Sequence, residues 1–325
     1  TLFRSSGHYI EVPIIVKTSW FRPVILFFIL PWLGLIYSLN LDLGTDYAMK
    51  TKYWIFLFVS ASCNMGEKQS FFIVKALWVG LLAGALLAFA QLVGLVPAIH
   101  QDYLGFGIVH TLLSMYLIVG ILMAAFYFKR VQGGWAKAGI LSLIIAFLFH
   151  LAVLRGRGGY VVFVLLSPLI ANELMYKFSV KAKVITAACL VMVLLLSPVV
   201  RERLVITVQM IQTNKEKIMK GEIIEDMVRF YMATESLKAM KNNPILGAGT
   251  GSLYALTRPS GHPVGHPHNN ILYMGASFGI VGIFSCLWLF GTMLIVSWRA
   301  RQTPLGYFIL SSCLVLFLGG MFDTQ

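Results

Sequence analysis

The sequence predicts an all-α polytopic membrane protein, and its composition, its long apolar runs and the placement of its basic residues all support this fold class. Of the 325 residues, 58% are hydrophobic and only 12% are charged, whereas about a quarter of the residues in a soluble domain are charged. Polar residues are too few to cover a water-facing surface. We therefore expect a single transmembrane domain over 1–325, with about nine transmembrane helices and one large loop on the outer side containing an amphipathic helix.

The apolar runs define the expected helices one by one, because a helix needs about 20 mostly apolar residues to cross a bilayer. The expected spans are 22–40, 52–65, 71–97, 104–128, 138–154, 158–176, 184–200, 268–298 and 304–322. The second run is short, and its assignment depends on the charge pattern of the connections. The chain starts without a methionine and stops just after an apolar run, so we expect a fragment of a longer protein.

Basic residues occupy alternate connections between these spans. They are Arg4, Lys17, Arg22, Lys68, Lys75, Lys129, Arg130, Lys137, Lys177, Lys181, Lys183, Arg299 and Arg301. The positive-inside rule assigns these connections to the cytoplasm. The rule also accounts for the net charge of +13, so we expect no nucleic-acid partner and membrane lipid as the surroundings.

The segment 201–267 is the only sizeable extramembrane piece that we predict, and it is expected to form a cap on the outer side. Within it, 222–241 has the apolar period of an amphipathic helix, and a proline at 244 ends it. The following GAGTGSL sequence (247–253) is expected to be a flexible glycine loop. It lacks the lysine of a P-loop and a preceding strand, so we predict no nucleotide site.

The first candidate site is the turn between two spans that contains Arg155 and Arg157. Arginine at this depth is costly and normally meets an anion. Its planar fork suits phosphate, and the glycines beside Arg157 allow an anion to approach the backbone amides. The alternative is that these side chains extend to lipid headgroups without any further role.

Arg229 lies on the predicted amphipathic helix and is the second candidate. Glu225 and Asp226 precede it by four and three residues, so an ion pair within the helix is the alternative to anion binding. Asp323, at the end of the last apolar run, is expected on the same side and could pair with one of the arginines.

The third candidate is the sequence HPVGHPHNN (262–270), immediately before a span. A histidine there can transfer a proton or donate a hydrogen bond to a phosphate or sugar, and the start of the helix offers backbone donors to an anion. We select His268 as the proton-transfer residue, with His266 and Asn269 as substrate-binding residues. The alternatives are a histidine that only caps the span and a structural metal, which the prolines and the absence of cysteine or glutamate disfavour.

Taken together, these motifs resemble the bacterial O-antigen ligase and O-antigen polymerase superfamily. That family has a re-entry arginine turn, a long external loop with an arginine and a P-x-x-G-x-G sequence, and an H-N pair that opens a span ending in G-x-x-G. The corresponding residues here are 155–159, 229–251 and 266–283. The resemblance covers essentially the whole chain and implies about twelve spans in a full-length member.

The resemblance also implies roles for single residues. Arg157 matches the essential re-entry arginine of the family, Arg229 its loop arginine and His268 the histidine of the H-N pair, while His266 matches a frequent companion histidine. Ser277 departs from the pattern, because many members have a glutamate there.

The function implied is a metal-independent glycosyltransferase without cofactors in the bacterial inner membrane, with its site facing the periplasm. The donor is a glycan on undecaprenyl diphosphate, and the acceptor is a sugar hydroxyl of a lipid-linked saccharide such as the lipid A core. Arg157 and Arg229 hold the departing diphosphate, and His268 orients or deprotonates the hydroxyl. A polymerase or a protein O-oligosaccharide ligase would use the same residues. The rival from another class is a transporter of an anionic solute, which the near absence of charges within the spans disfavours.

Overall fold

The computed structural model describes residues 17–54, 67–98, 104–215, 228–257 and 265–322. Every regular element in these ranges is a helix, and none of their residues is in a strand, so the predicted all-α class is confirmed for them. The chain divides into two compact units. Unit 1 is Thr1–Gly66, Asn214–Arg299 and Gly320–Thr324, and unit 2 is Glu67–Thr213, Ala300–Gly319 and Gln325. The single transmembrane domain stays a prediction.

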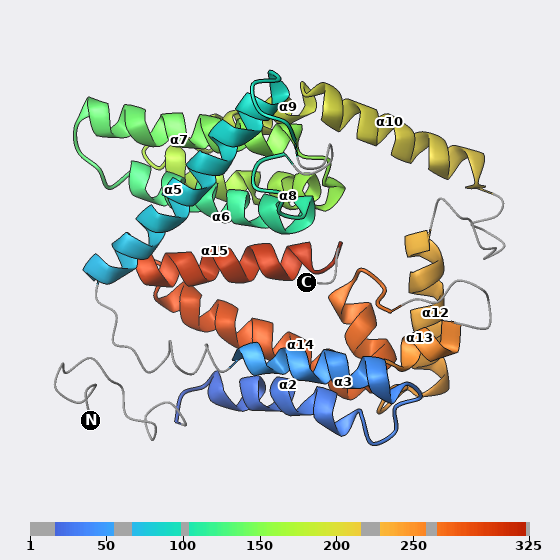
Figure 1. Cartoon of the computed structure of the whole chain (residues 1–325). Helices are drawn as coiled ribbons and strands as arrows, with labels where there is room; N and C mark the ends of the chain where they lie inside the picture. The colour runs from blue at the N-terminus through green and yellow to red at the C-terminus, as the bar shows by residue number, and fades with distance from the viewer. Residues whose placement is uncertain (1–16, 55–66, 99–103, 216–227, 258–264, 323–325) are drawn as a thin grey trace. The chain divides into compact units, whose positions relative to one another are not determined.

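Unit 2 is a bundle of long apolar helices around α6. Its helices are α5 (Glu67–Leu92), α6 (His110–Phe128), α7 (Gly134–Val153), α8 (Arg157–Leu174), α9 (Val180–Leu195), α10 (Pro198–Thr213) and α15 (Pro304–Gly319). The centre of the bundle is α6, which packs against α5, α7, α8 and α15 (Figure 1). Because neighbours surround it, nearly all of its side chains from Leu113 to Phe126 are buried, and a helix buried on every side is apolar on every side.

Unit 1 contains α2 (Phe21–Leu33), α3 (Leu41–Met49), the 3₁₀ helix η2 (Lys50–Trp54), α12 (Val228–Asn242), α13 (Ser252–Thr257) and α14 (Asn270–Arg299). Two hydrophobic clusters hold these helices together. The first joins α2 to α14 through Leu30, Met274, Phe278 and Cys286. The second joins α12 and α13 to α14 through Tyr231, Ala239, Leu253 and Ala276. The helix α14 is therefore the central element of this unit.

The described helices make the protein a multi-pass membrane protein. Four of them are long and apolar enough to cross a bilayer: α5 from Lys68 onward, α6, α7 and α14. A fifth span results if α9 and α10, which meet at 83°, are counted as one broken span, and α2 and α15 are shorter apolar helices. Nine spans and their orientation stay predictions, and the expected span 52–65 lies mostly outside the described residues.

The expected cap 201–267 contains three described helices, and they fall in different units. Residues 201–213 belong to α10 and to unit 2, whereas α12 and α13 belong to unit 1. The amphipathic helix predicted over 222–241 is observed from Val228, and residues 222–227 lie outside the described part of the chain. Tyr231 on this helix is buried at 7% exposure.

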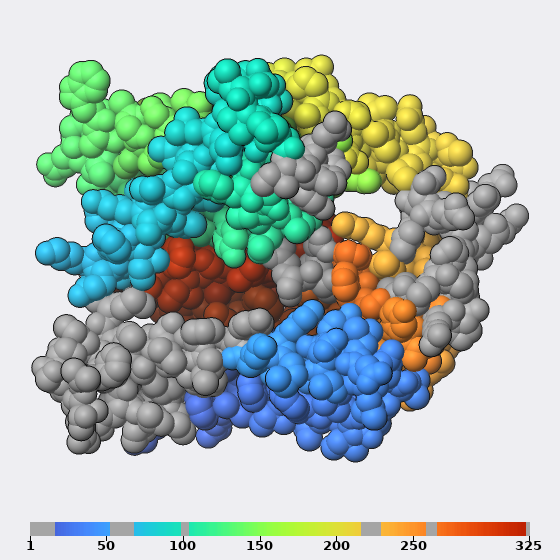
Figure 2. Space-filling model, in the orientation of Figure 1, coloured from blue at the N-terminus to red at the C-terminus, as the bar shows by residue number. Residues whose placement is uncertain are grey.

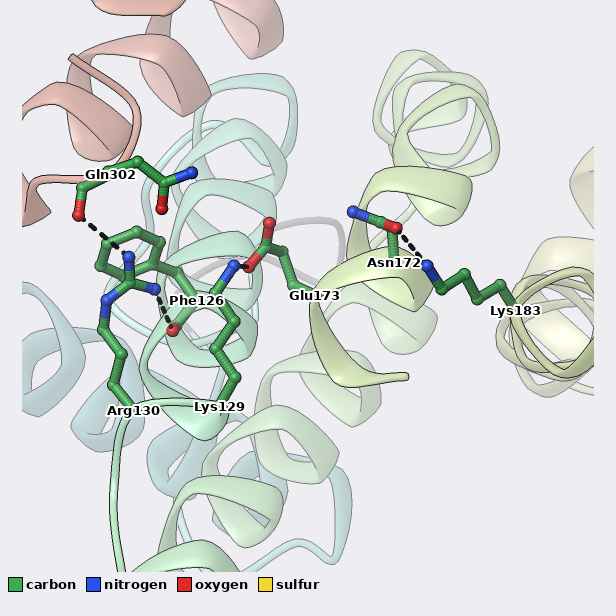
Figure 3. A network of polar contacts seen from close by, with 7 residues as sticks. All are labelled: Phe126, Lys129, Arg130, Asn172, Glu173, Lys183 and Gln302. Atoms are coloured by element: carbon green, nitrogen blue, oxygen red, sulfur yellow. Dashed lines mark hydrogen bonds and ion pairs between the residues drawn. The ribbon is translucent and has the colours of Figure 1, made fainter. Parts of the chain in front are cut away.

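One end of unit 2 is fastened by polar contacts (Figure 3). The Lys129 ammonium pairs with the carboxylate of Glu173, whose side chain is only 8% exposed. Arg130 donates from Nη1 to the Phe126 carbonyl (3.0 Å) and from Nη2 to the Gln302 carbonyl (2.9 Å), and its guanidinium lies 3.4 Å from the centroid of the Phe126 ring. These contacts connect the ends of α6 and α8 to the start of α15, on the side that the sequence predicts to be cytoplasmic.

Candidate functional site

His268 lies in a strained turn immediately before α14. Its φ of 52° is the only positive φ among the described residues other than glycine, and strained backbone of this kind is concentrated at functional sites. The His266 and His268 rings meet edge to face, with 4.3 Å between their centroids. The turn therefore brings two of the predicted site residues together.

Asn269 caps the first turn of α14. Its side-chain oxygen accepts a hydrogen bond from the Leu272 amide (2.9 Å), which is the usual role of asparagine at an N-cap. Its side-chain nitrogen donates to the Met321 carbonyl (2.8 Å). The asparagine thus has a structural role in the turn, and substrate binding by it stays a prediction.

Three consecutive carbonyls at 320–322 connect this turn to Arg229. The Asn270 amide donates to the Gly320 carbonyl (2.6 Å), Asn269 donates to Met321, and Nη1 of Arg229 donates to the Phe322 carbonyl (3.0 Å). Arg229 comes from the second residue of α12 and is exposed. We call residues 320–322 the carbonyl strip. It holds the predicted loop arginine and the predicted H-N pair on one short piece of backbone.

The structure describes some of the residues on which the alternatives for Arg229 and for a metal site depend. Arg229 has a partner outside its own helix, whereas Glu225 and Asp226 lie outside the described residues, as does Asp323. His262 also lies outside them. Among the residues that the structure does describe, no group of three or more His, Cys, Asp or Glu is arranged to hold a metal ion.

The glycine loop is packed against α14 and hydrogen-bonded to it, so the expectation that the loop is flexible is wrong. The helix α14 is broken at Gly279 (φ 60°, ψ −149°), which exposes backbone groups on either side of the break. The amides of Ala248 and Gly249 donate to the carbonyls of Ala276 and Ser277, both at 2.9 Å, and the Ile280 amide donates to the Pro244 carbonyl (2.9 Å). The loop therefore replaces the hydrogen bonds that the broken helix lacks.

The glycines are needed for this close approach. Gly247 has a φ of +69°, and a Cβ on it would overlap the backbone nitrogen of Phe278. A Cβ on Gly279 would likewise overlap the Ile245 carbonyl group. The two glycine motifs of the sequence are thus one packing unit, and this arrangement supports α14 directly behind the His268 turn.

Arg155 and Arg157 occupy the turn between α7 and α8 in unit 2. Arg157 is the first residue of α8 and is exposed, Arg155 is half-buried, and Gly158 and Gly159 are buried. The Nη1 atom of Arg157 donates to the Thr207 hydroxyl on α10 at 2.9 Å. Sequence analysis did not single out Thr207, because a threonine among mixed polar and apolar residues gives no signal of an arginine partner.

The turn packs tightly on the start of α6, which explains its glycines. A Cβ on Gly159 would overlap the Ser114 side chain, and a Cβ on Gly156 would contact the His110 ring and carbonyl. The Tyr160 hydroxyl donates to the Leu154 carbonyl and closes the turn from within. These contacts fix the backbone that carries the two arginines.

The predicted site residues thus fall into two groups. Arg229, His266, His268 and Asn269 are joined within unit 1 by the strained turn and the carbonyl strip. Arg155 and Arg157 are joined within unit 2 by the re-entry turn. Each group combines a cationic side chain with glycine-dependent backbone, as expected of a site for an anionic substrate.

The long apolar helices of the described residues are those of a multi-pass membrane protein. Residues 138–287 match the sequence model of a family described as O-antigen ligase, so the resemblance to the O-antigen ligase superfamily is confirmed. No match to a curated protein was found. The family indicates glycosyl transfer of the ligase or polymerase type with lipid-linked glycan substrates. The matched range contains α7 from residue 138 onward, together with α8, α12 and the His268 turn.

Proposed function

We propose that the protein transfers a glycan from undecaprenyl diphosphate to a sugar hydroxyl of a lipid-linked acceptor, at the periplasmic face of the bacterial inner membrane. The observation that supports this most strongly is the carbonyl strip, which ties Arg229 and the His268 turn to the same three residues. The residue that binds the leaving group and the residue that contacts the attacking hydroxyl must act on one substrate. The reaction therefore requires that the two residues be held at fixed positions relative to each other.

The diphosphate is the anchor and the leaving group of the donor. When the bond to the anomeric carbon breaks, negative charge develops on the phosphate oxygens, and fixed guanidinium groups stabilise it strongly in a poorly hydrated site. Arg157 and Arg229 supply these groups, with Arg155 adding charge at the same turn. Because the donor arrives activated, the reaction draws on no nucleotide.

His268 orients or deprotonates the incoming sugar hydroxyl, and His266 supports it by ring contact. A neutral imidazole accepts the hydroxyl proton as the oxygen attacks the anomeric carbon. Attack opposite the departing diphosphate inverts the configuration at that carbon. The new bond joins the acceptor oxygen to the sugar, and the undecaprenyl diphosphate leaves with the electron pair.

The residues are equally compatible with a polymerase that extends its own glycan or with a ligase that acts on a protein side chain. Analysis of carrier-linked glycans in cells lacking the protein separates the first two activities. Loss of a ligase leaves long chains on the carrier lipid, whereas loss of a polymerase leaves single repeating units. An unchanged set of carrier-linked glycans, with uptake of an anionic solute lost instead, would overturn the proposed function in favour of transport.

A further inference from the structure

Both flanks of the His268 turn contact one side chain, that of Tyr47 on α3. Before the turn, a Cβ on Gly265 would lie 2.7 Å from the Tyr47 hydroxyl oxygen, which is too close for such atoms. The hydroxyl therefore lies directly against the glycine. After the turn, the Tyr47 ring meets the Tyr273 ring edge to face, with 6.2 Å between their centroids. One tyrosine thus spans the segment that carries the two histidines.

The helix α3 packs closely on the glycine loop, so Tyr47 projects from a fixed support. Gly44 and Ala48 are its buried residues, and because they are four residues apart they share one face of the helix. A Cβ on Gly44 would overlap the Thr250 carbonyl, and a Cβ on Gly251 would overlap the backbone of Gly44. The absence of side chains at these two glycines brings the two backbones into direct contact.

Hydrogen bonds also hold both ends of α3. Just before its start, the Leu39 amide donates to the Ser252 hydroxyl (2.9 Å). Just after its end, the Thr51 hydroxyl donates to the Ala48 carbonyl (2.6 Å) and accepts a hydrogen bond from Nε1 of Trp32 on α2 (3.0 Å). The position of Tyr47 is therefore set by α2 and by the glycine loop, both of which belong to unit 1.

The other face of α3 is exposed, and the segment that contains α2 and α3 forms part of the molecular surface (Figure 2). The Lys50 ammonium lies 4.8 Å from the centroid of the Tyr47 ring, which adds a cation–π contact. Burial, and to a smaller extent the Asp46 carboxylate, raise the pKa of Tyr47 above its ordinary value. The phenol therefore stays protonated at neutral pH, and it can pack or donate a hydrogen bond but cannot serve as a base.

We propose that Tyr47 is a positioning residue that holds the His268 turn in the geometry used for glycosyl transfer, and that Gly265 provides the space for its hydroxyl. This inference rests on the proposed function and adds α3 to the same site. The strained backbone at His268 persists only where surrounding contacts determine it, and Tyr47 supplies one contact on each flank. A displacement of about 1 Å can lower a rate about 100-fold, so a residue that only fixes the turn can have a large effect on kcat.

The contact between Gly265 and Tyr47 predicts a compensating pair of substitutions. Gly265→Ala adds a Cβ where the hydroxyl lies, so we expect it to displace the turn and to lower kcat about 10- to 100-fold. Tyr47→Phe keeps the ring and should retain most of the turnover. Because phenylalanine leaves room for the Cβ, the double variant should recover to near the Tyr47→Phe value, as expected for residues in contact. Transfer by purified protein in lipid nanodiscs measures this, and a double variant as slow as Gly265→Ala would overturn the inference.

Tyr47→Leu removes the ring from both flanks and separates positioning from substrate binding. We expect kcat to fall about 10-fold or more while KM for the donor stays near the wild-type value, because the diphosphate is assigned to the arginines. Gly291→Ala is the matched control, since a Cβ on this glycine of α14 would meet no described atom within 4 Å, and it should keep its turnover. A lower thermal midpoint of Tyr47→Leu with unchanged turnover per folded molecule would assign Tyr47 to stability alone and overturn the inference.

Chemical modification of histidine tests the turn without any transfer. Diethyl pyrocarbonate reacts with accessible imidazole rings, and mass spectrometry gives the rates at His266 and His268 relative to His110 on α6. We expect Gly265→Ala to change the rates at the turn histidines and the double variant with Tyr47→Phe to restore them. Unchanged rates in Gly265→Ala and in Tyr47→Leu would overturn the inference even if the wild type transfers glycan. An absence of transfer in the wild type would overturn the proposed function, whereas the expected pattern of rates would still support the contact between Tyr47 and the turn.

Discussion

The two ends of unit 2 carry the same kinds of basic residue and use them differently. At one end, Lys129 pairs with the buried carboxylate of Glu173, and Arg130 donates to two backbone carbonyls. At the other end, Nη1 of Arg157 donates to the hydroxyl of Thr207 on α10. The helix α8 spans the distance between these ends, with Arg157 as its first residue and Glu173 near its last.

This difference predicts separate roles for the basic residues at the two ends of unit 2. A cation paired with a carboxylate of the chain stabilises the fold, because removing one partner leaves a buried charge uncompensated. The proposed function instead assigns Arg157 to the diphosphate of the donor, so its charge is expected to act on the substrate. Substitutions at the Glu173 end should therefore change stability, and substitutions at the Arg157 end should change transfer.

The largest effect is expected for Arg157→Ala. Loss of a guanidinium that stabilises the departing diphosphate should lower kcat/KM at least about 10³-fold, while the thermal midpoint in detergent stays near that of the wild type. Arg157→Lys should recover little, because a lysine keeps the charge but loses the two-pronged donor. Measurement of turnover with a lipid-linked donor, alongside the thermal midpoint, checks both points. Substantial activity in the alanine variant would assign Arg157 to lipid anchoring instead.

Arg229→Ala should lower kcat/KM for transfer to a similar extent as Arg157→Ala, although Arg229 lies in unit 1. Lys238 on the same helix is the matched control, because it pairs with Glu235 three residues earlier, and this hydrogen bond raises the pKa of Lys238 above its ordinary value. Lys238→Gln is expected to leave turnover unchanged and to cost less than about 0.5 kcal/mol, since exposed pairs are worth little. Equal losses in the two variants would point to general damage to α12.

His268→Ala should lower turnover about 10²-fold, the lower end of the range for general-base catalysis. His268→Gln keeps a hydrogen-bonding tip without a group that titrates, so we expect it to be as slow as the alanine variant. Near-normal turnover in His268→Gln would leave the residue with a positioning role only.

Arg130→Ala tests the end of unit 2 whose basic residues are expected to contribute to stability and not to transfer. It removes two hydrogen bonds to carbonyls and the contact with the Phe126 ring, so we expect a loss of about 1–3 kcal/mol of stability. Turnover per folded molecule should be unchanged. Thermal unfolding in detergent and transfer by the surviving fraction measure the two quantities. A selective loss of transfer would show that this end also takes part in the reaction.

The long apolar helices were predictable from the sequence, because hydrophobicity alone determines them. The apolar runs predicted α5, α6, α7 and α14 to within about six residues at each end, because a membrane-spanning helix needs only length and low charge. The corner between α9 and α10 was missed, although Ser197 and Pro198 are a helix-start signal. An apolar run of suitable length before them concealed it.

The sequence singles out the candidate residues, whereas the connections among them come only from the structure. Arginine and histidine beside glycine at the ends of spans are rare enough to stand out, and the structure joins Arg229 to the His268 turn through the carbonyl strip. Backbone carbonyls at 320–322 give no side-chain signal, so the strip could not be anticipated. The glycine loop was misinterpreted as flexible, because sequence does not distinguish a glycine that moves from one that permits close packing.

The central claim is that Arg157 holds the diphosphate of a lipid-linked glycan donor. The most direct measurement is donor affinity for the purified protein in lipid nanodiscs, compared between the wild type, Arg157→Ala and Arg130→Ala. The claim predicts that the wild type and Arg130→Ala bind the donor alike, that Arg157→Ala binds it at least about 10-fold more weakly, and that pyrophosphate competes. Equal donor affinity in all three proteins would contradict it.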